Sequence, residues 1–242
     1  MRPAHPSTTA VPICTDVSNM SKSQATLSPA SQLRVAVRAQ EAFLRHGYDS
    51  MTMVTLAAAC GLTRRALYYY FSSKDEAFRA MIQLENDSAL DLGRRAAQNV
   101  LNSKRPTALA AIAAWMDARY GETRRKLSTS PFGKEINDAA FAICGDIMVE
   151  YATLSHDELA KLLRLLQKKR LLKLNRSASP ESVGRLLADG ARGVNQTRPP
   201  IPNSALAERY REISAAILYG TAQSRAPSLS SATSATPPSH RR

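Results

Sequence analysis

The chain has 242 residues, a formal net charge of +13 and a sequence pI near 10.0, so it can hold one large domain or a small and a larger one. The cationic excess indicates an anionic partner, either nucleic acid or a membrane surface, although free use of arginine gives the same balance. Three widely spaced cysteines exclude a disulfide framework and a zinc site, and no apolar run reaches ~18 residues. We therefore expect a cytoplasmic protein without a metal or cofactor.

The N-terminal third predicts four helices after a tail. Residues 1–27 are rich in Ser, Thr, Pro and Ala and are expected to be disordered. A first helix should begin at Ser28-Pro29 and end at Gly47. Thr52 is placed to cap a second short helix that ends at Gly61, and Thr63 a third over residues 64–70. The sequence Ser-Lys-Asp-Glu at 73–76 is a capping box that opens a long fourth helix.

The rest of the chain keeps a helical pattern as far as residue 222. Helices are expected over residues 107–122, with less definition over 131–138, and over 139–172 as one kinked helix or two. Two more are expected over 180–195 and 204–220, followed by a second disordered tail over 222–242. The fold class is therefore all-α. The domains are an N-terminal unit over residues 28–80 and a larger helical unit over 81–221.

The segment GLTRRALYYYFSSK, residues 61–74, combines features of a surface that binds something outside the chain. Two short helices that meet at a glycine have the proportions of a helix-turn-helix. Leu67 and Phe71, four residues apart, should face inward, which leaves arginines and tyrosines outside. Arginine can donate two hydrogen bonds to guanine, and tyrosine offers a ring for thymine methyls and a hydroxyl for phosphate. The segment therefore predicts a recognition helix for the DNA major groove.

These residues, together with the helix before them, resemble the DNA-binding domain of TetR-type transcriptional regulators. The resemblance is carried by AFLRHGYDSMT at 42–52, LAAACG at 56–61, LYYYF at 67–71 and Lys74. It covers roughly residues 30–80, and the remainder is similar only in being helical and of suitable length. It implies a dimeric, DNA-binding regulator, most often a repressor, that leaves a palindromic operator when a small molecule binds.

The resemblance also implies roles for individual residues. Gly61 matches the turn glycine. The base-reading positions are Arg64, Arg65 and Tyr69. The phosphate-contacting positions are Thr52, Thr63, Tyr68, Tyr70 and Lys74. Many members have a small residue where Arg65 stands, so the operator sequence does not carry over from the family.

Structural alternatives remain for two of these residues. Tyr68 can be mainly a packing residue with its hydroxyl at the rim. Lys74 can be a solvated first-turn residue, although a helix that begins at this lysine offers amide donors and an ammonium to a phosphate.

The dimer and the effector pocket are implied by the resemblance alone. Dimerisation is expected through the last two helices. Its expected contacts are Val183, Leu187, Gly190, Val194, Leu206, Tyr210, Ile213 and Ile217, with burial inside the same chain as the alternative. The expected pocket residues are Trp115, Met116, Arg119, Tyr120, Phe132, Phe141 and Met148, all of which can equally be plain core. Arg119 can bind an anionic ligand group, or it can pair with Asp117 or Glu122.

Other classes of function have less support. An enzyme is not expected, because His46 and His156 lack a matching nucleophile or metal-ligand spacing and no glycine-rich phosphate loop is present. A membrane-surface protein is suggested only by the basic, leucine-rich run at 162–172. A regulator without a small-molecule effector is the nearest alternative.

Overall fold

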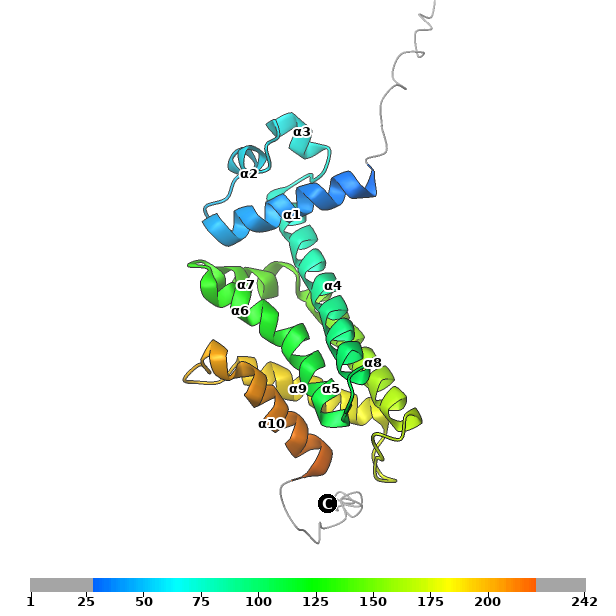
Figure 1. The fold of residues 1–242 in the computed structure, drawn as a ribbon. Helices are drawn as coiled ribbons and strands as arrows, with labels where there is room; N and C mark the ends of the chain where they lie inside the picture. The colour runs from blue at the N-terminus through cyan, green and yellow to red at the C-terminus, as the bar shows by residue number, and fades with distance from the viewer. Residues whose placement is uncertain (1–27, 221–242) are drawn as a thin grey trace, which may run out of the picture.

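The computed structural model describes residues 28–220, which form an all-α protein as predicted (Figure 1). In chain order the elements are α1 (Pro29–His46), α2 (Met53–Ala59), α3 (Arg64–Tyr68), α4 (Lys74–Leu101), α5 (Ala108–Met116), the π-helix η1 (Asp117–Gly121), α6 (Glu122–Thr129), α7 (Gly133–Ile143), α8 (Gly145–Lys168), α9 (Pro180–Asn195), the 3-10 turn η2 (Asn203–Ala205) and α10 (Leu206–Tyr219). The tails expected over residues 1–27 and 222–242 lie outside the described residues.

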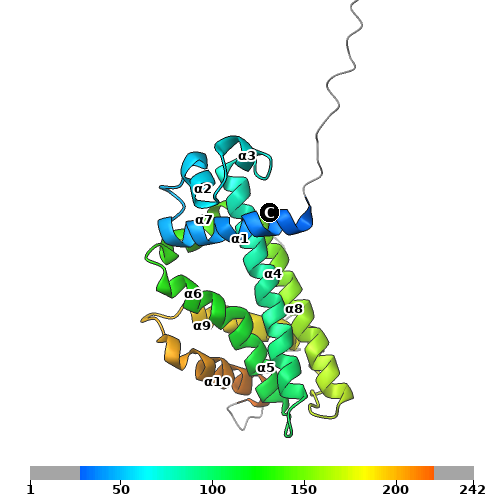
Figure 2. The same ribbon diagram turned by 45° about the horizontal axis from the view of Figure 1, so that its top comes forward.

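The helices α1 to α3 sit together on the first turns of α4 and form what we call the head (Figure 1). Its centre is aromatic: Phe43 of α1 meets Phe78 of α4 edge to face at 5.2 Å between ring centroids, and Tyr48 lies 4.8 Å from Phe78. Phe43, Phe78 and Leu67 are fully buried. Such pairs contribute more than the area they bury. A turn of the view shows α1 crossing the start of α4, so the head is fixed to that helix (Figure 2).

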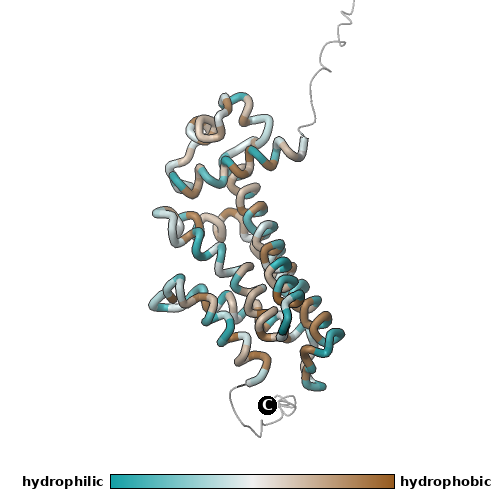
Figure 3. Tube along the Cα trace, viewed as in Figure 1, coloured by the Kyte–Doolittle hydropathy of each residue, from teal (hydrophilic) through white to brown (hydrophobic). Residues whose placement is uncertain are grey.

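The remaining helices form the body, which α4 enters without a break. α4 has 28 residues and so spans about 42 Å. The boundary expected between residues 80 and 81 therefore lies within a continuous helix. Trp115 of α5 packs against Gly93 of α4, where an added Cβ would lie 3.0 Å from the indole nitrogen. Along the helices of the body, apolar and polar residues alternate in bands, as amphipathic packing requires (Figure 3).

Of the two alternatives expected for residues 139–172, the structure has two helices: the segment is divided at Cys144, so α7 takes residues 133–143 and α8 is a separate helix. Ser155 lies inside α8, where its buried hydroxyl donates to the carbonyl of Tyr151 at 2.7 Å. No helix in the described part of the chain is long and apolar enough to cross a membrane. Within residues 28–220 no cluster of His, Cys, Asp or Glu could hold a metal ion.

Gly133 is required where α6 turns into α7. A Cβ added there would lie 1.9 Å from the carbonyl oxygen of Leu127, whereas nothing lies within 4 Å of a Cβ added at Gly145, the first residue of α8. We expect Gly133→Ala to lower the free energy of unfolding by about 2 kcal/mol or more, and Gly145→Ala to be neutral or slightly stabilising. Thermal unfolding followed by circular dichroism at equal protein concentration measures both. Equal midpoints for the two variants would contradict the close approach of the backbone.

Candidate DNA-binding face and ligand cavity

Local contacts cap the starts of α2 and α3 and shape the turn between them. The Thr52 hydroxyl accepts the amide of Thr55 at 3.2 Å, and the Thr55 hydroxyl accepts the amide of Thr52 at 2.9 Å, which closes a reciprocal box. The Thr63 hydroxyl accepts the amide of Ala66 at 3.1 Å. Gly61 has a φ of +67°, a conformation that favours glycine. These contacts fix the start of both short helices before any partner is bound.

The side chains of α3 divide as the sequence predicts. Leu67 is fully buried and Phe71, just after the helix, is 7% exposed. Arg64 and Arg65 are exposed, and Tyr69 is 63% exposed. Within the described residues Arg65 has no hydrogen bond or ion pair, so its guanidinium donors are available to a partner.

Tyr68 is not an interior residue, since it is 43% exposed. Its hydroxyl lies 3.4 Å from a terminal nitrogen of Arg64, and the guanidinium carbon lies 5.6 Å from the ring centroid. This cation–π contact holds the Arg64 side chain against Tyr68, the last residue of α3. The two arginines therefore differ: Arg64 is positioned by a tyrosine, and Arg65 is free of such a contact.

Tyr70 and Lys74 lie closer to the interior than the resemblance implied. Tyr70 is partly buried against the core, and α3 ends two residues before it. The Lys74 ammonium donates to the carbonyl of Tyr48 at 3.1 Å and lies 4.0 Å from that ring's centroid. Lys74 therefore joins the loop after α1 to the start of α4. An ammonium has three donors, so this contact leaves capacity for a phosphate.

The capping box at α4 differs in one partner. The Ser73 hydroxyl accepts the amide of Glu76 at 3.1 Å as expected. The carboxylate of Glu76, however, accepts from the amide and hydroxyl of Ser72, each at 2.5 Å, instead of from Ser73. Hydrogen bonds to Ser72 lower the pKa of Glu76, so the carboxylate is held in its charged form.

A cavity of about 640 Å³ lies beneath the head, between α4, η1, α6, α7, α8 and α9. This volume is in the range of small-molecule sites. Four of the expected pocket residues line it: Arg119, Tyr120, Phe141 and Met148. The other three do not. Trp115 packs on Gly93, and the Met116 sulfur lies 3.1 Å from the Ser214 hydroxyl, so both are core residues. Phe132 packs beside Gly47 at the loop after α1.

The π-helix η1 brings Arg119 and Tyr120 to the cavity wall. The sequence predicted an uninterrupted helix here, because a π turn leaves no clear trace in periodicity. π turns are rare in proteins as a whole, and those that occur are often at functional sites. Tyr120 is 8% exposed, and its hydroxyl is buried without a hydrogen-bond partner.

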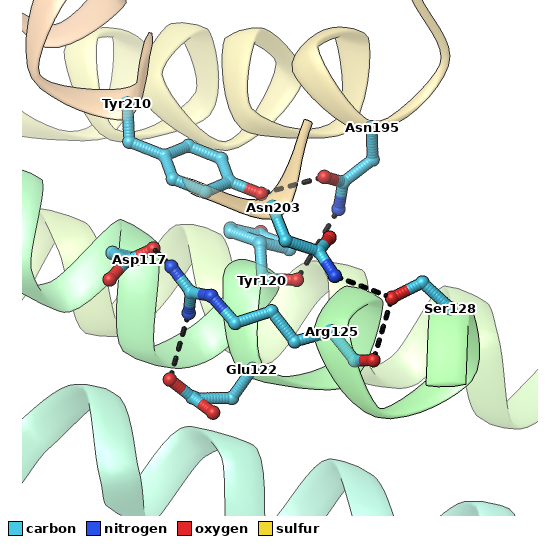
Figure 4. Close-up of polar contacts among 8 residues, drawn as sticks. All are labelled: Asp117, Tyr120, Glu122, Arg125, Ser128, Asn195, Asn203 and Tyr210. Atoms are coloured by element: carbon cyan, nitrogen blue, oxygen red, sulfur yellow. Dashed lines mark hydrogen bonds and ion pairs between the residues drawn. The ribbon is translucent and has the colours of Figure 1, made fainter. Parts of the chain in front are cut away.

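Arg119 is 7% exposed and has only neutral hydrogen-bond partners. It donates to the Asn86 amide oxygen at 2.9 Å and to the Ser155 hydroxyl at 3.3 Å. The sequence allowed pairing with Asp117 or Glu122, but both carboxylates bind Arg125, at 2.6 and 2.8 Å (Figure 4). Burial lowers the pKa of Arg119, although an arginine stays protonated in proteins.

Asn86 and Ser155 were missed by the sequence reasoning. Each is a polar residue on the inner face of a long amphipathic helix, and that interruption of an apolar stripe is the signal that could have found them.

Most of the residues expected at a dimer interface are buried within the chain. These are Val183, Leu187, Val194, Leu206 and Tyr210. Tyr210 is fully buried, and its hydroxyl donates to the Asn195 side chain at 2.6 Å (Figure 4). Gly190, Ile213 and Ile217 remain half-buried at the seam between α9 and α10. The apolar stripes of these helices therefore serve the chain's own core, which is the alternative that the sequence left open.

Comparison with known proteins identifies the type of domain in the head. Residues 37–81 match the family model of bacterial regulatory proteins, tetR family. The head therefore carries a DNA-binding domain of the type found in tetR-family regulators, and the matched segment contains the end of α1, α2, α3 and the start of α4. None of the curated proteins compared with this regulator matches it.

Solved structures of regulators share its fold. A transcriptional regulator from Cytophaga hutchinsonii is 20% identical, with a TM-score of 0.55 over 76% of this chain and 92% of that one. A TetR-family transcriptional regulator from Streptomyces coelicolor is 17% identical, with a TM-score of 0.55 over 77% and 87%. SmeT, the repressor of the Stenotrophomonas maltophilia multidrug efflux pump SmeDEF, is 17% identical, with a TM-score of 0.53 over 78% and 90%.

The position of Lys74 predicts a structural effect in the free regulator. Lys74→Ala removes a hydrogen bond and a cation–π contact that join the α1–α2 loop to α4, so we expect a loss of about 1 kcal/mol in stability. Arg95→Ala, on the exposed part of α4 in the body, is the control and should change little. Thermal unfolding without DNA measures the difference. A Lys74 variant as stable as the Arg95 variant would show that the ammonium is only a surface charge.

Proposed function

We propose that this regulator is a homodimeric repressor that binds a palindromic operator and releases it when a small molecule enters the cavity. The observation that carries the proposal is the physical link between the two sites. α7 and α4 both line the cavity, and both also contact the head. We propose a binding function rather than a catalytic one, in the cytoplasm where the operator is.

The proposed DNA contacts follow from exposure. Arg64, Arg65 and Tyr69 would read bases, because all three are exposed, the arginines at the start of α3 and Tyr69 directly after its end. Thr52, Thr63, Tyr68, Tyr70 and Lys74 would contact phosphates. The hydroxyls of Thr52 and Thr63 accept helix amides in the free chain, and each retains a hydroxyl hydrogen for a phosphate oxygen.

The proposed dimer surface is the outer side of α9 and α10. Leu186 of α9 is 56% exposed, and a Cβ added at Gly193 would meet nothing within 4 Å. These two residues continue through Gly190 to the half-buried Ile213 and Ile217 of α10. Small and apolar residues on an open seam suit close packing of helices from two protomers. A two-fold axis there would place two α3 helices on the two half-sites of a palindrome.

The proposed route from ligand to DNA runs through α7. The Glu135 carboxylate accepts the backbone amides of Tyr48 and Asp49, at 2.5 and 2.7 Å, and so holds the loop after α1. Just before α7, the Ser130 hydroxyl donates to the carbonyl of Leu44 at 2.6 Å. Ile136 and Ala140, on the same helix, line the cavity. A ligand that displaces α7 would therefore displace the head.

α4 and α8 are joined near the same place. Arg79 of α4 donates to the carbonyl of Ile143 at 2.7 Å and to the Asp146 carboxylate at 2.8 and 2.5 Å. This bidentate contact lowers the pKa of Asp146 to about 2. The start of α8 therefore moves with α4, and a shift of either helix is passed to the other.

The membrane-surface alternative loses its main feature. In the basic run at 162–172, Leu162, Leu163 and Leu166 are buried in the core, and Lys168 and Lys169 are exposed. The apolar side of this segment is therefore not available to lipid. A regulator without an effector remains the competing function, and it has no use for a cavity that contains a buried charge.

Selection of random duplex DNA on the purified regulator, with sequencing of the bound pool, tests the DNA-binding role. We expect a palindromic motif with two half-sites. Arg65→Ala should reduce the preference at one base position by about 1–3 kcal/mol, because a bidentate contact to guanine is lost. Arg95→Ala, about 30 Å along α4 from Lys74, should leave the motif unchanged. Binding that depends only on salt, without enrichment of any sequence, would oppose the proposal.

Glu135→Gln tests the route through α7. The variant keeps one acceptor but loses the charge, so the amides of Tyr48 and Asp49 should exchange hydrogen roughly fivefold faster or more, and operator affinity should change with them. Glu150→Gln, an exposed carboxylate on α8, is the matched control. Hydrogen exchange and operator binding are measured on the same samples. Faster exchange in the loop with unchanged operator affinity would rule out α7 as the coupling element.

A further inference from the structure

The charged residues in the wall of the cavity are mostly cationic. Six lining residues are arginine or lysine, and one, Glu85, is acidic. Glu85 is already occupied, since its carboxylate accepts from Lys126 and from Gln40, each at 2.5 Å. Lys134 and Arg192 pair with Asp138 and Asp189, which do not line the cavity, whereas Arg119 makes no ion pair within the described residues.

Arg119 is the one buried cation among these six lining residues. It is 7% exposed, and its partners Asn86 and Ser155 carry no charge. The nearest acids of its own segment, Asp117 and Glu122, bind Arg125 instead. Burial of a charge without a counter-charge is costly, and an arriving anion would reduce that cost.

A second polar group of the wall also lacks a partner. Tyr120 lines the cavity beside Arg119, whose guanidinium carbon lies 5.1 Å from the Tyr120 ring centroid. The Tyr120 hydroxyl is buried and unbonded. A buried donor without an acceptor is uncommon in folded proteins, and a site that receives a polar ligand is one reason to retain it.

The cavity becomes apolar in the direction of the head. On α4, Met81 and Ile82 stand one turn before Asn86 and thus nearer the head. On α8, Met148 precedes Ser155 by two turns. The same side also includes Leu44, Ile136 and Ala140, together with the polar Gln40, Lys134 and Asn137 of α1 and α7. A ligand that fills the site therefore meets a buried cation at one end and a more apolar wall at the other.

We propose that the cavity binds an amphipathic carboxylate, whose carboxylate is held by Arg119 and whose apolar chain extends toward α7 and Leu44. This proposal names the chemical class of the small molecule in the proposed function, and its role in regulation rests on that function. Guanidinium groups suit carboxylates because two parallel N–H donors match the two oxygens. A neutral or cationic amphiphile of the same length would leave Arg119 unpaired.

The test compares decanoate with decanol and decylamine on the full-length chain. Trp115 is the only tryptophan, and its ring centroid lies 6.0 Å from that of the lining residue Tyr120, so tryptophan fluorescence reports a change at Tyr120. We expect decanoate to bind about tenfold more tightly than decanol and to raise the thermal unfolding midpoint more than either control ligand. Equal affinities for decanoate and decanol, tighter binding of decylamine, or no binding of decanoate overturns the proposal.

Variants at Arg119 sharpen the assignment. Arg119→Gln should lower decanoate affinity about tenfold while leaving decanol affinity nearly unchanged, and Arg119→Lys should recover part of the loss. Arg185→Gln, an exposed arginine of α9 outside the cavity, is the control and should bind decanoate normally. Equal decanoate affinity in Arg119→Gln and the unmodified chain overturns the role of Arg119. If Arg119→Gln does not fold, the comparison of the acid with the alcohol still decides the ligand class.

Operator binding in the presence of decanoate separates this inference from the proposed function. Decanoate that binds through Arg119 and also releases the operator supports both. Decanoate that binds through Arg119 without changing operator affinity supports the ligand class and opposes the effector-released repressor.

Discussion

The structure depends on one constraint, which is that the head and the cavity share the first turns of α4. Phe78 fills the head core, whereas Met81, Ile82 and Asn86 line the cavity within about two further turns. A helix is stiff over this length, so a displacement at Asn86 reaches Phe78. The close packing of aromatic rings around Phe78 then transmits the displacement to α1 without absorbing it. This connection acts beside the one through α7, where Glu135 holds the loop after α1.

The charges around the cavity follow from how the carboxylates are distributed. Arg125 binds both Asp117 and Glu122, the acids nearest to Arg119 in the sequence. These pairs are partly exposed and contribute little stability, but they leave Arg119 without an ion pair. Its burial is offset only by two neutral hydrogen bonds. The free chain therefore buries a charge without a counter-charge, which is unfavourable. Binding sites commonly contain such a charge, because a ligand of opposite charge removes the unfavourable free energy.

The parts of the fold that could be predicted are those set by contacts within a few residues. Thr52, Thr63 and Ser73 cap their helices as expected, and Gly61 adopts the positive φ of the turn. Contacts between segments that are distant in the sequence could not be predicted from local patterns. Periodicity showed that Leu187 and Tyr210 lie on apolar faces, but it could not tell whether the same chain or a partner covers those faces. The π turn at Arg119 and the loop held by Glu135 arise from such distant packing.

The proposed ligand would act through a difference in how its two ends are held. Its carboxylate would meet Arg119 together with Asn86 and Ser155, all of which belong to the body. Its apolar chain would meet Leu44, at the end of α1, and Ile136 of α7, beside the contact that holds the head. A group bound equally in both positions of the head shifts no equilibrium. The carboxylate would therefore supply affinity, and the length and shape of the chain would decide how far the head moves.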